Sequence, residues 1–250
     1  MPYRTIAYRE TGGIGTITLN RPRVNNALNT QSAQEMGDVC AKINQDQAVR
    51  VVIITGAGKS FSVGTDLNDV SSEAAWWSVA GPVSRLNCPV IAAINGDALG
   101  QSLELALACD LRIAAETARL GLLQITSGFI PRDGGTQRLP RLIGRAQALE
   151  MILLGEPVDA NEAYRMGLVN KVVPPEELLP VVSDTARRMA SMSPLALRYI
   201  KEAVSKGLEL TMGQGLRLET DLSLILQTTE DRTEGITAFR EKRLPEFKGK

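Results

Sequence analysis

The sequence contains no histidine and only three cysteines among its 250 residues. Without histidine, the Ser-His-Asp and Cys-His nucleophilic arrangements and most zinc or iron sites are excluded. Cys40, Cys88 and Cys109 form no close pair, which argues against a disulfide framework and favours a reducing compartment. Any proton transfer must therefore use carboxylates, tyrosine, lysine, cysteine or water.

Net charge and long apolar runs are also missing. Lys plus Arg and Asp plus Glu both total 28, so no basic stripe indicates a nucleic-acid partner. No window approaches the roughly 20 apolar residues of a membrane span, and the first residues do not resemble a signal peptide. The sequence therefore predicts a cytoplasmic protein with neither a membrane nor a nucleic-acid partner.

What the sequence does contain is a pattern of alternating strands and helices. Residues 3–10 and 14–19 predict a β-hairpin, and the apolar runs 51–55, 89–94 and 111–115 predict strands of a largely parallel sheet. Between them, residues 30–43, 71–86 and 103–109 favour helices. After about Pro140 the pattern is mostly helical, over 141–154, 161–167, 176–192, 194–206 and 212–227, with one strand-like run at 168–173. The fold class is α/β.

Two features in this pattern could carry chemistry. Glu104 stands in the first turn of an otherwise apolar helix, where a carboxylate either serves a reaction or complements the helix dipole. Asp110 follows that helix and is expected to be a turn residue. The glycine-containing loops 62–66 and 96–100 follow strand ends, where exposed amides can bind an anion or a developing oxyanion, or where the glycines only form turns.

Five segments together resemble the enoyl-CoA hydratase/isomerase (crotonase) superfamily. They are VIITGAGKSFSVGTD at 52–66, PVIAAINGDALG at 89–100 with residues 104–110, GFIPRDGGTQRLPRLIG at 128–144, NEAYRMGLVNKVV at 161–173 and EGITAFREKR at 234–243. The resemblance runs in order from about residue 4 to 248. It implies a spiral of ββα repeats over residues 1–195 and a helical trimerisation and CoA-covering region over 196–250, in a homo-oligomer that is a trimer or a dimer of trimers.

The same resemblance implies a site for an acyl-CoA thioester. The backbone amides of Thr65 and Gln101 match the oxyanion hole, and Glu104 matches one of the two glutamates of typical hydratases. Gln124 stands where the second glutamate is expected, and Gln101 and Ser102 replace glycines. The ordinary two-glutamate mechanism would therefore need another residue in place of the second glutamate.

Asp133 is a candidate for that substitute, because an aspartate of the matching segment is catalytic in dienoyl-CoA isomerases and 4-chlorobenzoyl-CoA dehalogenases. Glu104 and Asp133 would then form the working carboxylate pair, with Gln124 holding a water. The alternative is that Asp133 caps the helix that follows it.

Other residues are assigned by the resemblance to CoA and to the acyl group. Arg23, Val24 and Asn25 match the adenine and pantetheine contacts, with Asp66 in the adjoining loop. Phe239 and Lys242 would reach a neighbouring subunit's ligand. Trp76 and Trp77 fall in the segment that shapes the acyl pocket, although one of them could equally be a core residue. CoA enters only as part of the substrate, and neither a further cofactor nor a metal is expected.

These assignments leave several functions open. The leading one is hydration of a 2-enoyl-CoA by an EC 4.2.1-type lyase. Double-bond isomerisation follows, because one carboxylate suffices to move a proton. Hydration, hydrolysis or ring cleavage of a cyclic acyl-CoA is a third possibility, and a catalytically silent CoA binder is the alternative outside enzymes.

Overall fold

The computed structural model describes residues 3–69 and 77–250. Its N-terminal hairpin consists of β1 (Ile6–Thr11) and β2 (Ile14–Leu19), joined through Gly12 and Gly13 at φ values of 59° and 79°. The hairpin was predicted, but β1 begins later than residue 3. The reason is that Glu35 accepts hydrogen bonds from the amides of Arg4, Thr5 and Ile6, so part of this backbone bonds to a side chain.

The main sheet has the strand order β1-β2-β3-β4-β6-β9, in which every pair after the hairpin is parallel. Its further strands are β3 (Val51–Gly56), β4 (Val90–Ile94), β6 (Leu111–Ala115) and β9 (Lys171–Val173). The predicted central strands are thereby confirmed. Their apolar runs arise because both faces of the sheet are covered.

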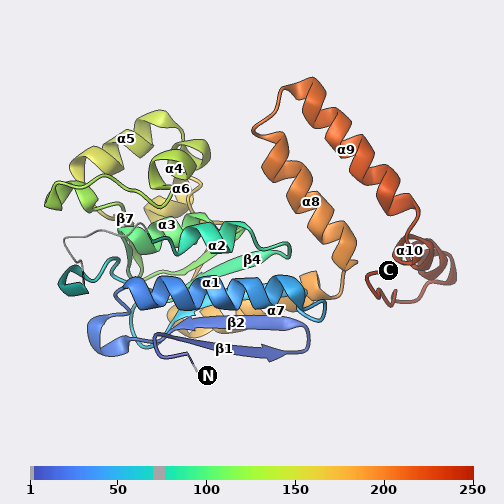
Figure 1. Cartoon of the computed structure of the whole chain (residues 1–250), viewed down its shortest axis with the longest axis horizontal. Helices are drawn as coiled ribbons and strands as arrows, with labels where there is room; N and C mark the ends of the chain where they lie inside the picture. Colours follow the sequence, from blue (N-terminus) through green and yellow to red (C-terminus); the bar gives the residue numbers. More distant parts are fainter. Residues whose placement is uncertain (1–2, 70–76) are drawn as a thin grey trace.

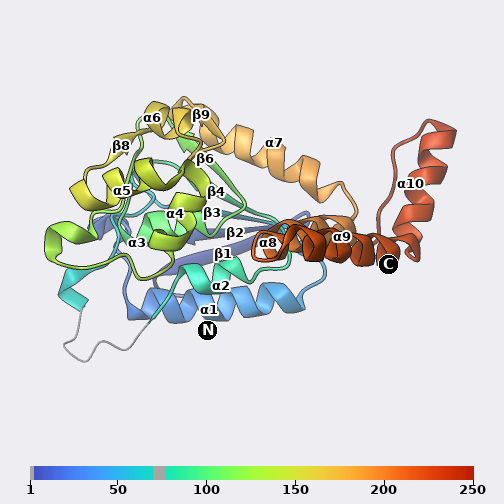
Figure 2. The same ribbon diagram turned by 90° about the horizontal axis from the view of Figure 1, so that it is seen from above.

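Helices pack on both faces of this sheet (Figures 1 and 2). One core cluster includes Val52 and Ile54 of β3 with residues of α1 (Thr30–Gln45), α2 (Ala80–Ser84) and α3 (Gln101–Leu107). The alternate residues Val51 and Ile53 pack with α7 (Leu178–Ala190) in a second cluster. Successive side chains of one strand thus enter two separate cores.

A second, smaller sheet was not foreseen. It joins β5 (Ala98–Leu99), β7 (Arg119–Gly121) and β8 (Val158–Asp159), and it lies beside α4 (Gly135–Ile143), α5 (Arg145–Leu154) and α6 (Ala160–Arg165). Its strands have only two or three residues, too few for an alternating apolar pattern. Short 3-10 helices lie at several points along the described chain: η1 (Pro22–Val24), η2 (Leu67–Asp69), η3 (Gln124–Ser127) and η4 (Pro175–Glu177).

Two predicted helices differ from those in the structure. The helix expected over 71–86 is limited, within the described residues, to α2, which begins at Ala80. The helix expected over 141–154 is divided between α4 and α5. Gly144, at a φ of 81°, ends the first and begins the second, so the chain changes direction there.

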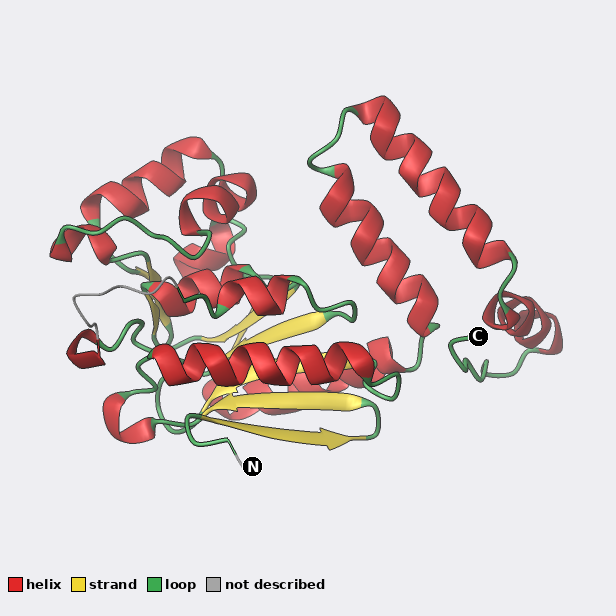
Figure 3. Ribbon diagram, in the orientation of Figure 1, coloured by secondary structure: helices red, strands yellow, loops and turns green. Residues whose placement is uncertain are grey.

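Residues 194–250 form a helical arm that extends from the core (Figures 1 and 3). The arm consists of α8 (Pro194–Gly207), α9 (Met212–Gln227) and α10 (Glu230–Glu241). α8 therefore begins within two residues of the boundary expected at 195–196. Asp231 secures the arm's base, because its buried carboxylate accepts hydrogen bonds from the Ser193 hydroxyl and the Gly249 amide.

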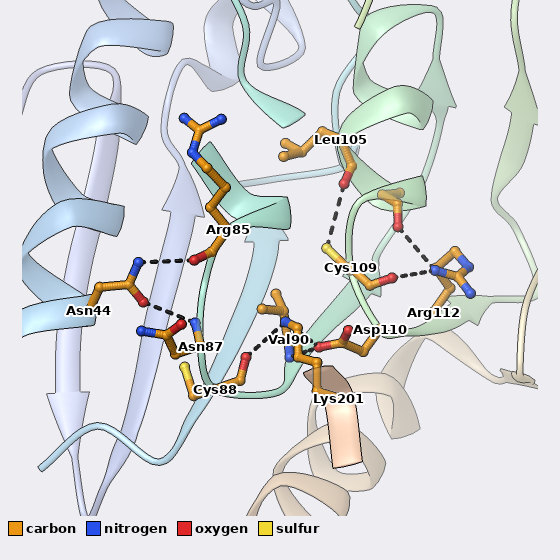
Figure 4. A network of polar contacts seen from close by, with 11 residues as sticks. Asn44, Arg85, Asn87, Cys88, Val90, Leu105, Cys109, Asp110, Arg112 and Lys201 are labelled. Atoms are coloured by element: carbon orange, nitrogen blue, oxygen red, sulfur yellow. Dashed lines mark hydrogen bonds and ion pairs between the residues drawn. The ribbon is translucent and has the colours of Figure 1, made fainter. Parts of the chain in front are cut away.

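A polar network joins the arm to the core (Figure 4). Lys201 of α8 donates to the Cys88 carbonyl and forms an ion pair of 2.8 Å with Asp110, which also accepts from the Val90 amide. Asp110 is therefore a turn residue, as expected, and it also links the arm to β4 of the main sheet. Beside it, the buried Arg112 donates to the carbonyls of Ala106, Cys109 and Leu168.

No helix in the described part of the chain combines the length and apolar character that a membrane span needs. The arm does expose large apolar side chains along α8 and α9, among them Ile200, Val204, Leu216, Leu224 and Ile225.

Candidate active site

The site is a cavity of about 230 Å³ between the loops that follow β3 and β4 and the segment around η3. Thr65 and Leu67 form one part of its wall, Gln101 and Glu104 of α3 form another, and residues of the segment 123–132 form a third. The structure thus brings together three predicted site residues from α3 and η3 with the Thr65 loop. Parallel strands commonly place ligand sites at this end of a sheet.

The backbone amides of Thr65 and Gln101, two residues of the cavity lining, have no hydrogen-bond acceptor among the described residues. The glycines before them, Gly64 and Gly100, have φ values of 96° and 57°. A Cβ on Gly64 would lie 2.6 Å from the Leu99 carbonyl oxygen, so the close approach of the two loops requires glycine there. The loops thus present a pair of donors that could bind one oxyanion.

The side chains at positions 101 and 102 tie these loops together. The Thr65 hydroxyl donates to the Gln101 side-chain oxygen at 2.9 Å, and the side-chain Nε2 of Gln101 donates to the Asp133 carboxylate at 3.1 Å. The Ser102 hydroxyl lies 2.6 Å from the Ser62 carbonyl and 2.7 Å from the Leu99 carbonyl. Ser102 is fully buried and outside the cavity lining, whereas Gln101 forms part of the cavity wall.

Glu104 is buried with only 1% of its surface exposed, and it is a lining residue of the cavity. Its Oε1 accepts from the amides of Asp133 at 2.7 Å and Gly135 at 2.8 Å. Burial raises the pKa of Glu104 to about 7; the two amide hydrogen bonds oppose this rise, and the negative charge of Asp133 adds to it. A carboxyl group with this pKa can both take and give a proton near neutral pH.

Gln124 contacts the second oxygen of this carboxyl group. Its Nε2 donates to Glu104 Oε2 at 2.8 Å. Its Oε1 is buried and has no hydrogen-bond partner in the described structure. The side chain therefore orients Glu104 and retains one acceptor in a cavity that could hold a water or a substrate hydroxyl.

Asp133 does not cap the helix that follows it, and its catalytic role stays a prediction. Its carboxylate accepts from the Ser78 hydroxyl and from the amides of Val79 at 2.8 Å and Ala80 at 3.1 Å, at the start of α2. It therefore caps an earlier helix, not α4, which follows it and has no side-chain cap. Asp133 is 7% exposed and is not among the residues that line the cavity. It contacts the site through Gln101, and its backbone amide binds Glu104.

The residues expected to bind CoA lie beside the Thr65 wall. The Asn25 carbonyl accepts from the Val63 amide at 3.1 Å, and Arg23 and Val24 are exposed in η1. Asp66 forms an ion pair of 2.9 Å with Arg21, a partner that the sequence analysis did not single out. This segment is therefore bonded to the loop that carries Thr65.

The other predicted contacts lie elsewhere. Phe239 is 85% exposed on α10, in the arm, and Lys242 ends that helix. Trp76 falls outside the described residues. Trp77 packs against the main core and does not line the cavity. Instead, the apolar part of the cavity wall contains Leu123, Phe129 and Ile130. The sequence did not point to these residues, because their spacing matches neither the apolar period of a helix nor that of a strand.

No three side chains of His, Cys, Asp or Glu converge as a metal site within the described residues. The donor pair and the buried acid face the same cavity, which is suited to reactions that pass through an enolate of a carbonyl compound.

Comparison with known proteins agrees with this chemistry. The profile of the enoyl-CoA hydratase/isomerase family matches residues 9–250. A probable enoyl-CoA hydratase of Mycobacterium tuberculosis is 41% identical over 254 residues, covering 99% of each chain. A 2,3-dehydroadipyl-CoA hydratase of Escherichia coli is 42% identical over 241 residues and 94% of each chain.

A crystal structure of an enoyl-CoA hydratase from Bacillus anthracis superposes with a TM-score of 0.94, at 41% identity, over 99% of this chain and 100% of that one. The chain belongs to the enoyl-CoA hydratase/isomerase family and has the crotonase fold, as the sequence motifs predicted.

Proposed function

We propose that this protein is an enoyl-CoA hydratase that adds water across the 2,3-double bond of an acyl-CoA thioester. The observation that carries the proposal is the buried carboxyl group of Glu104, with a pKa of about 7, in one cavity with the unpartnered amides of Thr65 and Gln101. Relatives named as hydratases at about 40% identity over the full chain support the same activity.

In the proposed reaction Glu104 alone moves the proton. The ionised carboxylate accepts a proton from water as the water oxygen bonds to C3 of the enoyl group. The electron pair of the double bond moves into the thioester, and the amides of Thr65 and Gln101 stabilise the oxyanion of the resulting enolate. Protonated Glu104 then delivers its proton to C2, so that one water has been added in total.

Gln124 has a positioning role in this scheme. Its Nε2 keeps Glu104 in one orientation, and its Oε1 is available to accept a hydrogen bond from the attacking water. Because an amide does not exchange protons in the useful range, Gln124 cannot replace a second glutamate as an acid. Asp133 transfers no proton in this scheme, because its carboxylate accepts hydrogen bonds from the amides at the start of α2 and from the Gln101 side chain.

CoA is proposed to bind along η1 and the Asp66 loop, as part of the substrate and without a further cofactor. Arg23 suits the phosphates, and the exposed Val24 suits the adenine. Exposed apolar residues on α8 and α9 support assembly into a trimer or a dimer of trimers. Phe239 and Lys242 of α10 would then cover a neighbour's ligand.

Assembly is tested by sedimentation of the wild-type chain and of the Ile200→Glu, Leu224→Glu double variant. We expect a trimer or hexamer for the wild type and a smaller species for the variant. A wild-type monomer at micromolar concentration would contradict the assembly.

The activity itself is tested by incubating the pure protein with crotonyl-CoA and following the ultraviolet absorbance of the conjugated thioester, with mass analysis of the product. Loss of absorbance with a gain of one water supports the hydratase. Isomerisation is the second candidate, because Glu104 is the one carboxylate among the described residues lining the cavity. A rise in absorbance from a 3-enoyl-CoA at constant mass, without hydration of crotonyl-CoA, would favour it instead.

A further inference from the structure

The two amides that are proposed to stabilise the enolate oxygen lie on segments far apart in the sequence. Thr65 belongs to the loop after β3, and Gln101 begins α3 directly after β5. Backbone hydrogen bonds join the two segments as far as Leu99, whose amide donates to the Ser62 carbonyl at 3.1 Å. Within the described residues, no backbone hydrogen bond connects residues 63–66 with residues 100–104. The backbone pairing of the two segments thus stops short of the two donors.

A side-chain hydrogen bond continues the connection where the backbone pairing ends. The Thr65 hydroxyl donates to Oε1 of Gln101 at 2.9 Å, so the residue of one donor is bonded to the residue of the other. Gln101 lines the cavity but is only 2% exposed, and Thr65 is partly buried. A hydrogen bond in such a place is electrostatically stronger than one in water, so it restrains both residues.

The other end of the Gln101 side chain is also fixed. Its Nε2 donates to Oδ2 of Asp133 at 3.1 Å, and that carboxylate is held in turn by amides at the start of α2. The backbone amide of Asp133 donates to Glu104 at 2.7 Å. Because a carboxylate only accepts hydrogen bonds, Nε2 has to face Asp133, and Oε1 is left to accept from Thr65. The Gln101 side chain therefore has one defined orientation.

We infer that the Gln101 side chain is a positioning group for oxyanion binding, because it fixes the Thr65 amide relative to the amide of Gln101 itself. This inference rests on the proposed hydratase function, which supplies the oxyanion. Two donors stabilise one oxygen only when both lie within hydrogen-bond distance of it, and the stabilisation is greatest when the oxygen is most charged. Loss of the bridge between Thr65 and Gln101 should therefore slow the reaction more than it weakens binding of an uncharged thioester.

The bridge can be removed from either side while both backbone amides remain. Thr65→Val replaces the hydroxyl with a methyl group, and Gln101→Met replaces the side-chain amide with an apolar chain of similar length. In each variant kcat for crotonyl-CoA should fall about 10-fold or more, below the roughly 10²- to 10³-fold cost of losing a donor outright. The Kd of butyryl-CoA, which has no double bond to hydrate, should change less than about 3-fold in calorimetric titrations of the full-length protein.

A double variant distinguishes one shared hydrogen bond from two independent defects. When the bridge is already broken, the second substitution has no further effect on it. The kcat of Thr65→Val, Gln101→Met should therefore lie within about 3-fold of the slower single variant. Losses that multiply in the double variant would overturn the inference. A Kd for butyryl-CoA that rises as much as kcat falls would also overturn it, since the side chain would then serve binding in general.

Two further variants control for the substitutions themselves. Thr65→Ser keeps the hydroxyl and should retain kcat within about 3-fold of the wild type. Thr185→Val removes another partly buried threonine hydroxyl, which donates to the Val181 carbonyl at 2.9 Å in α7, outside the cavity lining. Its kcat and Kd should equal those of the wild type. If Gln101→Met fails to fold, the comparison of Thr65→Val with Thr65→Ser decides.

The infrared spectrum of bound butyryl-CoA, labelled with carbon-13 at the thioester carbonyl, tests the geometry without turnover. Hydrogen bonds from two fixed amides polarise the carbonyl, so its stretching frequency should be lower on the wild type than in water. In Thr65→Val and Gln101→Met the frequency should move back toward the value in water, and in Thr65→Ser it should stay lowered. A frequency that is not lowered on the wild type, or that is unchanged in both bridge variants, would overturn the inference.

These measurements separate the inference from the proposed function. Hydration of crotonyl-CoA by the wild type, with the same kcat in Thr65→Val, would refute the positioning role and leave the hydratase in place. Absence of hydration, together with a lowered carbonyl frequency that Thr65→Val reverses, would refute the hydratase and leave the positioning role in place.

Discussion

Replacing Glu104 by Gln should stabilise the protein at high pH while it slows turnover. In the folded state burial raises the pKa of this group to about 7, against an ordinary value of 4.5. The folded chain therefore holds the proton more tightly than the unfolded chain does. The stability that the protonated group provides is full below pH 4.5 and is lost as the pH rises through 7.

The magnitude follows from the size of the pKa rise. A rise of this size corresponds to about 3 kcal/mol, at roughly 1.4 kcal/mol per pKa unit. Glutamine is neutral throughout, so the stability of Glu104→Gln relative to the wild type should increase by about 3 kcal/mol between pH 4.5 and 8.5. The variant's oxygen can still accept from the amides of Asp133 and Gly135, and Gln124 can rotate so that its unpartnered oxygen accepts from the new amide.

The measurement is urea unfolding of both proteins at the two pH values and at one protein concentration. Glu150→Gln, at an exposed position of α5, is the control, and its difference from the wild type should change by less than about 0.5 kcal/mol. Turnover of Glu104→Gln should fall by about 10²- to 10⁴-fold, the usual contribution of a general acid–base. A stability difference that stays constant with pH would refute the raised pKa and the mechanism built on it.

Three further predictions concern the pH dependence of turnover and the buried side chains of Asp133 and Arg112. In the wild type, kcat/KM for hydration should rise with pH and level off above about 7, because the attacking water needs the ionised carboxylate; a profile that is flat from pH 5.5 to 8.5 would contradict this. Asp133→Asn should keep most turnover. Asp133→Ala should lose about 3 kcal/mol of unfolding free energy, because two buried amides at the start of α2 are left unpaired. Abolished turnover in a stable Asp133→Asn protein would instead support a catalytic role for Asp133. Arg112→Met should cost at least about 3 kcal/mol in urea unfolding, because three carbonyls lose their donor, and a loss below 1 kcal/mol would show that water replaces the side chain.

The elements that could be predicted from the sequence are those with a clear apolar period. The strand at Val51–Gly56 and the helix at Thr30–Gln45 have such patterns, since one is buried on both faces and the other on one. The motifs located the loops of Thr65 and Gln101 and the acid Glu104, which the structure brings into one cavity.

The rest depends on contacts between distant segments. Asp133 precedes α4, so sequence neighbours favour a cap on that helix, yet its carboxylate meets amides more than fifty positions earlier in the chain. Nothing local marks such a contact. Arg132 is similar, because its place in the cavity wall depends on how the segment after η3 folds back beside Trp77.

The helix α3 carries the donor of Gln101 and the acid Glu104 on the same first turn, and Arg112 holds the carbonyls at its other end. The spacing between the backbone positions of the oxyanion donor and of the proton carrier is consequently set by the hydrogen-bonded geometry of one helical turn. Sliding of neighbouring strands or helices moves both groups as a rigid unit. Substitutions at other cavity-lining residues can thus change the shape of the cavity without changing the distance between the backbone positions of Gln101 and Glu104.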